Sequence, residues 1–171
     1  LGARAVTRKD GLAIDVFYVE DKNGGVVDDP KIRQLCESSI RSFLADKISP
    51  DELISEKKKK TDRSQLFLNQ DKLGERIASQ VDVYRDISLN RTIVEVRAPD
   101  QVGLLHLIAK TISNCGFSIQ FARIATEQGI ATDVFNIEPL ESEDSFSPIR
   151  FLELREKLSA ALHEGKFYHE V

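Results

Sequence analysis

The sequence lacks a hydrophobic run long enough to cross a bilayer. A membrane-spanning helix needs about 20 predominantly apolar residues in succession, and no stretch of these 171 residues approaches that length. The first residues, Leu1–Asp10, are polar and carry three basic side chains with no apolar segment behind them, so no secretory signal peptide is expected. We therefore predict a cytoplasmic location and no membrane partner.

Cysteine and aromatic side chains are also scarce. The two cysteines, Cys36 and Cys115, fall at apolar positions of predicted helices. Two reduced core residues of a cytosolic protein are favoured over a disulfide between them. Tryptophan is absent and the formal net charge is −4. A negatively charged chain with few aromatic side chains is poorly suited to nucleic acid, so no nucleic-acid partner is expected.

Motifs of common catalytic sites are missing as well. The histidines, His106, His163 and His169, have no cysteine or marked carboxylate partner at metal-ligand spacing. There is no P-loop, no dinucleotide-binding glycine fingerprint and no nucleophile elbow. We predict that this chain has no catalytic residues, metal or cofactor of its own. His106 lies on a predicted helix beside the turn described below, where a site role and a plain surface role both stay open.

What the sequence does contain is an internal repeat. Residues 2–19, GARAVTRKDGLAIDVFYV, return at 121–137 as FARIATEQGIATDVFNI. Each copy has two β-rich runs around a turn that contains glycine, which predicts a β-hairpin. Further along the chain the repeat pairs Pro30 with Pro148, Ile40 with Leu158 and Leu44 with Leu162. Such repetition indicates two copies of one domain.

A helix is predicted after each hairpin. Asp29-Pro30 and Ser147-Pro148 place a capping side chain before a proline at the first helical position. Apolar residues then recur at helical spacing, as Ile32, Leu35, Cys36, Ile40 and Phe43 in one helix and Phe151, Leu154, Leu158, Ala161 and Leu162 in the other. Gly165 is the expected stop of the second helix.

The second copy, 90–171, has a complete set of predicted elements. They are Thr92–Ala98, Gly103–Asn114, Phe117–Thr126, Ile130–Ile137, Pro148–Glu164 and Phe167–Val171. Their order is strand, helix, strand, strand, helix, strand. This βαββαβ order predicts an α+β, ferredoxin-like sandwich, in which one antiparallel sheet carries two helices on one face.

The first copy, 1–46, has no counterpart of the opening strand and helix, so the chain is expected to be a fragment of a longer protein. Its last strand is predicted near Val81–Arg85, within about 80–88, because VDVYR alternates apolar and polar residues. The intervening 47–79 is read as an insertion in which Ser49–Glu52 marks a helix start. The run Lys57–Lys60 fits a solvated helix end or loop, with contact to phosphate, nucleic acid or an acidic surface as alternatives.

The stretch Thr92–Val102, TIVEVRAPDQV, with Gly103-Leu104-Leu105 after it, resembles the ACT domain, a small ligand-sensing module. It is similar in particular to the tandem ACT pair at the C-terminal end of bacterial PII uridylyltransferases (uridylyl-removing enzymes), where the stretch usually reads like TVLEVRAPDRPGLL. Gln101 and Val102 stand where that family has Arg and Pro. The Asp, the Gly and the two Leu remain as Asp100, Gly103, Leu104 and Leu105.

This strand–turn–helix stretch predicts a site for an anionic group. Free N–H groups and the positive end of the helix dipole face such a turn, which favours a carboxylate. The predicted ligand-binding residues are Asp100, Gln101, Val102, Gly103, Leu104 and Leu105. A ligand carboxylate would meet the N–H groups around Val102, Gly103 and Leu104. Asp100 is either the acceptor for a ligand ammonium group or a plain N-cap.

The resemblance implies a function for this site. It implies a regulatory module that binds glutamine and reports nitrogen status allosterically to catalytic domains upstream, in a nucleotidyltransferase that uses Mg²⁺. The alternative is a ligand-free ACT-type module for oligomerisation or protein interaction, with a homodimer through its sheet edges. Strand Phe117–Thr126 has Phe117, Ile119 and Phe121 on one face and Ala122 and Ile124 on the other, beyond a bulge, which fits a strand covered on both faces.

Overall fold

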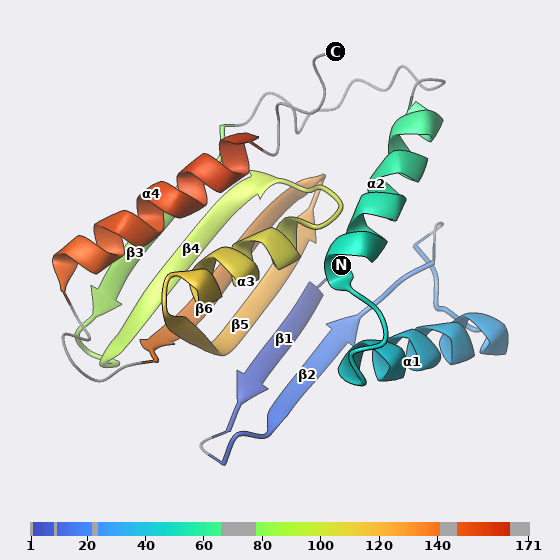
Figure 1. Ribbon diagram of the computed structural model, residues 1–171, viewed down its shortest axis with the longest axis horizontal. Helices are drawn as coiled ribbons and strands as arrows, with labels where there is room; N and C mark the ends of the chain where they lie inside the picture. Colours follow the sequence, from blue (N-terminus) through green and yellow to red (C-terminus); the bar gives the residue numbers. More distant parts are fainter. Residues whose placement is uncertain (1, 9, 22–23, 66–77, 141–146, 165–171) are drawn as a thin grey trace. The chain divides into compact units, whose positions relative to one another are not determined.

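The structure is a computed structural model, and it describes residues 2–8, 10–21, 24–65, 78–140 and 147–164. The strands are Gly2–Thr7 (β1), Ala13–Tyr18 (β2), Gln80–Asp86 (β3), Arg91–Pro99 (β4), Phe117–Glu127 (β5) and Ile130–Pro139 (β6) (Figure 1). The helices are Pro30–Leu44 (α1), Pro50–Gln65 (α2), Leu104–Asn114 (α3) and Pro148–Glu164 (α4). The chain divides into two compact units, one made of Leu1–Tyr18 with Lys72–Val171 and the other of Val19–Asp71.

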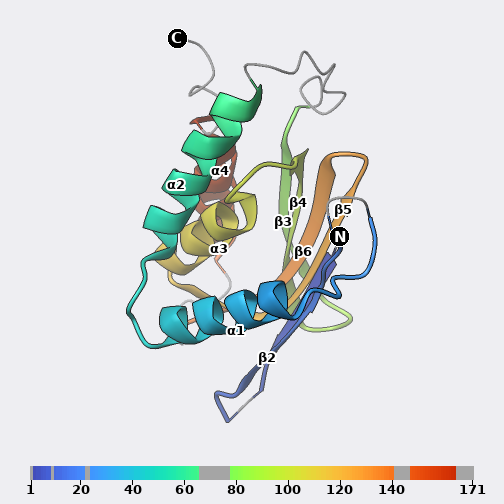
Figure 2. The ribbon, with the colours of Figure 1, turned by 90° about the vertical axis from the view of Figure 1, so that its right-hand side faces the viewer.

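The first unit is an antiparallel sheet of six strands in the order β2-β1-β5-β6-β4-β3. Helices α3 and α4 lie on one face of this sheet (Figure 2). Helix α3 packs against β5 and α4, and α4 packs against β3. The predicted α+β class is confirmed, and the arrangement is compatible with a ferredoxin-like fold.

The core of this unit lies between the sheet and the two helices. Every second residue of β4 and β6 faces the helices, as strand geometry requires. Buried apolar side chains come from all four elements: Val94, Val96, Ala98, Phe135, Ile137, Leu104, Ile108, Ile112, Leu154, Leu158 and Leu162. Each fully buried Val, Leu, Ile or Phe side chain among them is worth about 1.5–3 kcal/mol in transfer free energy. The intervening residues of β4, such as Glu95 and Arg97, are exposed on the other face.

Both predicted hairpins are confirmed. Strand β1 pairs with β2, and β5 pairs with β6. Gln128 and Gly129 in the second turn both have positive φ, at 51° and 75°, as a tight two-residue hairpin turn requires. Strand β1 also pairs with β5, so the two hairpins share one sheet.

The bulge expected in β5 lies one residue earlier than its apolar pattern predicts. The register shifts between Ile119 and Phe121, and Ala122 then stands opposite the buried Phe135. An extra residue reverses the alternation that follows it. The predicted face assignment is therefore wrong: Ala122 lies on the helix-covered face with Ile119, and Phe121 lies on the opposite face.

The strand predicted near Val81–Arg85 is present as β3, at the opposite edge of the sheet from β2. It pairs with β4, with Val83 opposite Val94 and Val81 opposite Val96. This register places both valines against the core, where α4 packs on β3. Pairing with β4 therefore places the apolar face of β3 against the core. The predicted strand Phe167–Val171 and the stop at Gly165 lie outside the described residues.

In the second unit, helix α1 begins where it was predicted. Asp29 is its N-cap, and the carboxylate accepts a hydrogen bond from the Lys31 N–H at 2.8 Å. No residue of α1 is buried. Leu44 is 74% exposed, whereas Leu162, its counterpart in the repeat, is 1% exposed. The difference arises because the described part of Val19–Asp71 contains no strand against which α1 could pack.

Two further predictions concern this unit. Cys36 was predicted to be a core residue and is exposed, because it lies on the uncovered α1, while Cys115 is half-buried. Helix α2 begins at Pro50 with Asp51 and Glu52 in its first turn, which confirms the predicted helix start. The run Lys57–Lys60 is exposed within α2 rather than at its end. None of the helices in the described ranges has both the length and the apolar content needed to cross a membrane.

Candidate functional site

The predicted site begins where β4 ends. Asp100 follows the strand directly, and its side chain is exposed. The Asp100 N–H donates to the carbonyl oxygen of Gly129 at 2.8 Å. This hydrogen bond holds the turn after β4 against the tip of the β5–β6 hairpin, so the hairpin fixes one end of the turn.

Helix α3 begins at an unusual cap. Its N-cap is Gly103, which has φ 86° and ψ 4° and makes no side-chain capping hydrogen bond. Only glycine adopts this left-handed conformation without steric cost. The N-cap interpretation of Asp100 is therefore wrong. The Leu104 N–H donates to the Gln101 carbonyl at 3.1 Å, and this turn delays the start of the helix until after Gly103.

The backbone N–H groups of the turn are only partly occupied. The Leu104 N–H is used within the turn, so it is not open to a ligand as it stands. Among the described residues, no acceptor is found for the N–H groups of Val102 and Gly103. These two donors lie at the positive end of the α3 dipole, where they can receive an anionic group.

The six predicted residues divide into two groups by burial. Leu104 is 4% exposed and belongs to the core with Ile108 and Ile112, so its side chain anchors the helix. Leu105 is exposed, and Gln101 and Val102 are half-buried. The accessible part of the site is therefore the turn Asp100–Gly103, and the side chain of Leu104 has a structural role.

A buried carboxylate near this turn was not among the predicted site residues. Asp133 on β6 is 1% exposed and faces the helices, in phase with Ala131 and Phe135. Its Oδ1 atom has no hydrogen-bond partner within the described residues. Burial, together with the nearby negative charge of Asp100, raises the pKa of Asp133 from 3.8 to about 6, and a hydrogen bond from the Ala125 backbone acts in the opposite direction.

The sequence contains a signal that could have identified Asp133. A charged residue stands in an otherwise apolar phase, Ala131, Asp133, Phe135 and Ile137, and such a residue is costly to bury. In the repeat, Asp133 is the first residue of an Asp-Val-Phe sequence that also occurs at 15–17. Its counterpart in the first hairpin, Asp15, is exposed. His106 is half-buried, and the described ranges hold no cluster of three or more ligating side chains that could bind a metal ion.

The sheet, its two covering helices and the turn before α3 define an α+β module. The chain is similar over nearly its whole length to a segment of bifunctional uridylyltransferase/uridylyl-removing enzymes, which confirms the resemblance noted for the stretch around Asp100. No family model matches the sequence, and no solved structure matches it.

Three relatives illustrate the extent of the similarity. The enzyme of Caulobacter vibrioides (strain NA1000 / CB15N) is 30% identical over 169 residues, which cover 97% of this chain and 17% of the relative. That of Gluconobacter oxydans (strain 621H) is 28% identical over 164 residues, 94% of this chain and 16% of the relative. That of Ectopseudomonas mendocina (strain ymp) is 27% identical over 164 residues, which cover 95% of this chain and 17% of the relative. This chain therefore spans about a sixth of the length of these enzymes.

Proposed function

We propose that this chain is a regulatory module that binds an amino acid, glutamine, at the turn Asp100–Gly103. The observation that carries the proposal is the glycine cap of α3, which leaves the N–H groups of Val102 and Gly103 without acceptors among the described residues. The similarity to bifunctional uridylyltransferase/uridylyl-removing enzymes supports a role within a larger chain of that kind. The partners of the module are then the catalytic domains of that chain, where Mg²⁺ would act.

The charges around the turn suit both ends of an amino acid. The ligand carboxylate accepts from the Val102 and Gly103 N–H groups at the helix end. The ammonium group lies toward Asp100, whose exposed carboxylate adds to the negative potential of the buried Asp133. A cation between two such carboxylates lowers their mutual repulsion. Glutamine should bind better than glutamate, because its neutral amide both donates and accepts hydrogen bonds.

Thermal unfolding with added amino acid tests this proposal. At a ligand concentration about 100 times the dissociation constant, binding adds about 2.7 kcal/mol to the free energy of unfolding. For a chain of this size that corresponds to a rise in Tm of roughly 5–10 °C. Glutamine should produce the rise, and glutamate should produce a smaller one.

Two matched glycine variants provide the control. Gly103→Val closes the backbone approach and should remove the glutamine response. Gly11 has a similar φ of 83°, with open space around it, in the β1–β2 turn. Gly11→Val should therefore carry a comparable backbone strain and still respond to glutamine. Equal loss of the response in both variants, or no response of the unaltered protein to any amino acid, would refute the sensor proposal.

A second function, assembly without a ligand, is favoured by one observation. Strand β2 is an edge of the sheet, and Ile14, Val16 and Tyr18 on it are all exposed. An exposed apolar edge strand is a template for pairing with another chain. Sedimentation should then show a homodimer that Val16→Lys dissociates. A monomer at all concentrations would exclude this alternative, and a Val16→Lys variant that still responds to glutamine would separate the two functions.

A further inference from the structure

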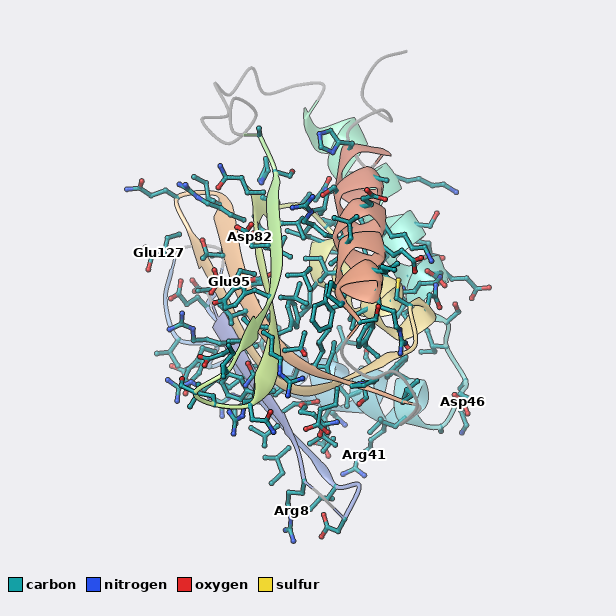
Figure 3. All side chains as sticks on the ribbon, turned by 90° about the vertical axis from the view of Figure 1, so that its left-hand side faces the viewer. Arg8, Arg41, Asp46, Asp82, Glu95 and Glu127 are labelled. Carbon is teal, nitrogen blue, oxygen red and sulfur yellow. The ribbon has the colours of Figure 1, made fainter. Side chains whose placement is uncertain are left out.

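The helix-free face of the sheet carries a hollow that the site above does not use. Its volume is about 430 Å³, and it is lined by Arg97, Arg123, Ala125, Glu127, Gln128, Ile130 and Thr132. Thr132 alternates along β6 with the buried Ala131 and Asp133, so the hollow lies on the face opposite α3 and α4. Figure 3 shows Glu95 and Glu127 on the side of the sheet away from α4.

Two arginines flank β6 within this hollow. Arg97 on β4 stands opposite Thr132, and Arg123 on β5 stands opposite Val134, two residues further along β6. Neighbouring strands are about 4.8 Å apart, so β4 and β5 are separated by about 10 Å, a span that two long side chains can bridge. No ion pair of Arg97 or Arg123 is found in the described part of the chain.

Two carboxylates on this face, Glu95 and Glu127, make no ion pair with the two arginines among the described residues. Glu95 is on the same strand as Arg97, but it accepts a hydrogen bond from the Tyr84 hydroxyl at 2.8 Å. Glu127 lines the hollow and makes no ion pair with either arginine among the described residues. The guanidinium groups thus face solvent with their donors open.

A third arginine lies beside the hollow. Arg4 on β1 stands directly opposite Arg123 on β5. The two residues are counterparts in the repeat, so pairing of the two hairpins brings one arginine against its own copy. Like charges at directly opposed positions of a sheet are destabilising. An anion bound next to Arg123 would offset this repulsion.

We propose that this hollow binds a small ligand through a phosphate group. The hollow is lined by two guanidinium groups and the carboxylate of Glu127, and Arg4 adds a third guanidinium group beside it. A phosphate monoester, with a charge near −2 and three acceptor oxygens at pH 7, can engage more of these donors than a single carboxylate can. Guanidinium groups recognise such oxyanions through paired N–H donors. The Thr132 hydroxyl and the Gln128 amide add neutral donors, and Ala125 and Ile130 form an apolar wall. The volume is that of a small-molecule site.

Calorimetric titration of the whole chain at low ionic strength tests the proposal, with inorganic phosphate, glycerol 3-phosphate and acetate as probes. Phosphate and glycerol 3-phosphate should bind with clearly lower Kd than acetate. Tighter binding of the ester identifies a phosphorylated metabolite as the ligand, and equal binding identifies free phosphate. Acetate binding as tightly as phosphate, or no phosphate binding at millimolar concentration, would overturn the assignment.

Variants distinguish a specific phosphate site from non-specific attraction of phosphate to basic side chains. Arg97→Gln and Arg123→Gln should each raise the phosphate Kd about tenfold, since each removes charge-assisted hydrogen bonds. Glu127→Gln should lower it severalfold by removing a like charge. Arg91→Gln is the matched control, because Arg91 is on the same strand and the same face as Arg97 but does not line the hollow. An equal loss in Arg91→Gln would show that no specific site exists.

Discussion

Replacing the buried Asp133 by asparagine should make the protein more stable at neutral pH. The folded state raises the pKa of Asp133 from 3.8 to about 6, chiefly through burial. The folded protein therefore binds this proton more tightly than the unfolded chain does. The free energy of unfolding is highest when Asp133 is protonated, and it falls as the pH rises from 3.8 through 6.

The size of the effect follows from the two pKa values. The folded and unfolded pKa values of Asp133 differ by about two units. This difference lowers the free energy of unfolding by about 3 kcal/mol at pH 7 and above, by about 1.6 kcal/mol at pH 5 and by about 0.6 kcal/mol at pH 4. Asparagine keeps an oxygen for the Ala125 N–H but adds a buried N–H donor, at a cost of about 1 kcal/mol. The variant should thus gain about 2 kcal/mol at pH 8 and be slightly less stable than the unaltered protein at pH 4.

Urea denaturation followed by circular dichroism, from pH 4 to pH 8, measures this difference directly. Other titrating groups cancel in the comparison, so the two stability curves should cross between pH 4 and pH 5. Asp15→Asn is the control, because Asp15 is the repeat counterpart of Asp133 and is exposed. Its difference from the unaltered protein should stay small at every pH. Parallel curves for Asp133→Asn would refute the reasoning, since they would show that the carboxylate is not buried in its charged form.

Two further predictions compare residues of the helices. Leu162→Ala should cost about 2–5 kcal/mol in unfolding free energy, because Leu162 is buried in the core of the sheet unit. Leu44→Ala, at the matching position of α1, should change it by less than about 0.5 kcal/mol. Chemical denaturation of both variants checks this, and equal losses would show that α1 is covered in solution. Asp29→Ala should weaken α1 locally by about 1 kcal/mol, seen as faster amide hydrogen exchange at its first turn, while exchange in α4 stays unchanged.

The secondary structure could largely be predicted from the sequence, because its signals are local. Each element is specified by its own residues, without reference to the rest of the chain. Examples are the alternation of apolar and polar residues in β4 and β6, the turn at Gln128-Gly129 and the helix cap at Asp29-Pro30. The partners of those elements are not local properties. The apolar pattern of α1 shows that one face could be buried but not whether a sheet covers it, and the pattern of β3 does not say which strand it joins.

The turn between β4 and α3 could be located from the sequence, but its geometry could not. Asp100, Gly103 and the strand before them were found from one stretch of sequence. Whether Asp100 or Gly103 caps the helix depends on the left-handed φ of Gly103 and the turn closed by Gln101, which composition does not reveal. The burial of Asp133 depends on packing by α3 and α4, and the hollow around Arg123 depends on strand register. Both follow only from the three-dimensional arrangement.

The strand order determines where the segment that contains α1 and α2 joins the sheet. That segment leaves the sheet from β2 and returns to it at β3, and these strands are the two opposite edges. Five strand spacings separate the edges, a distance of about 24 Å. The sheet alone therefore sets the distance between Tyr18, the last residue of β2, and Gln80, the first residue of β3.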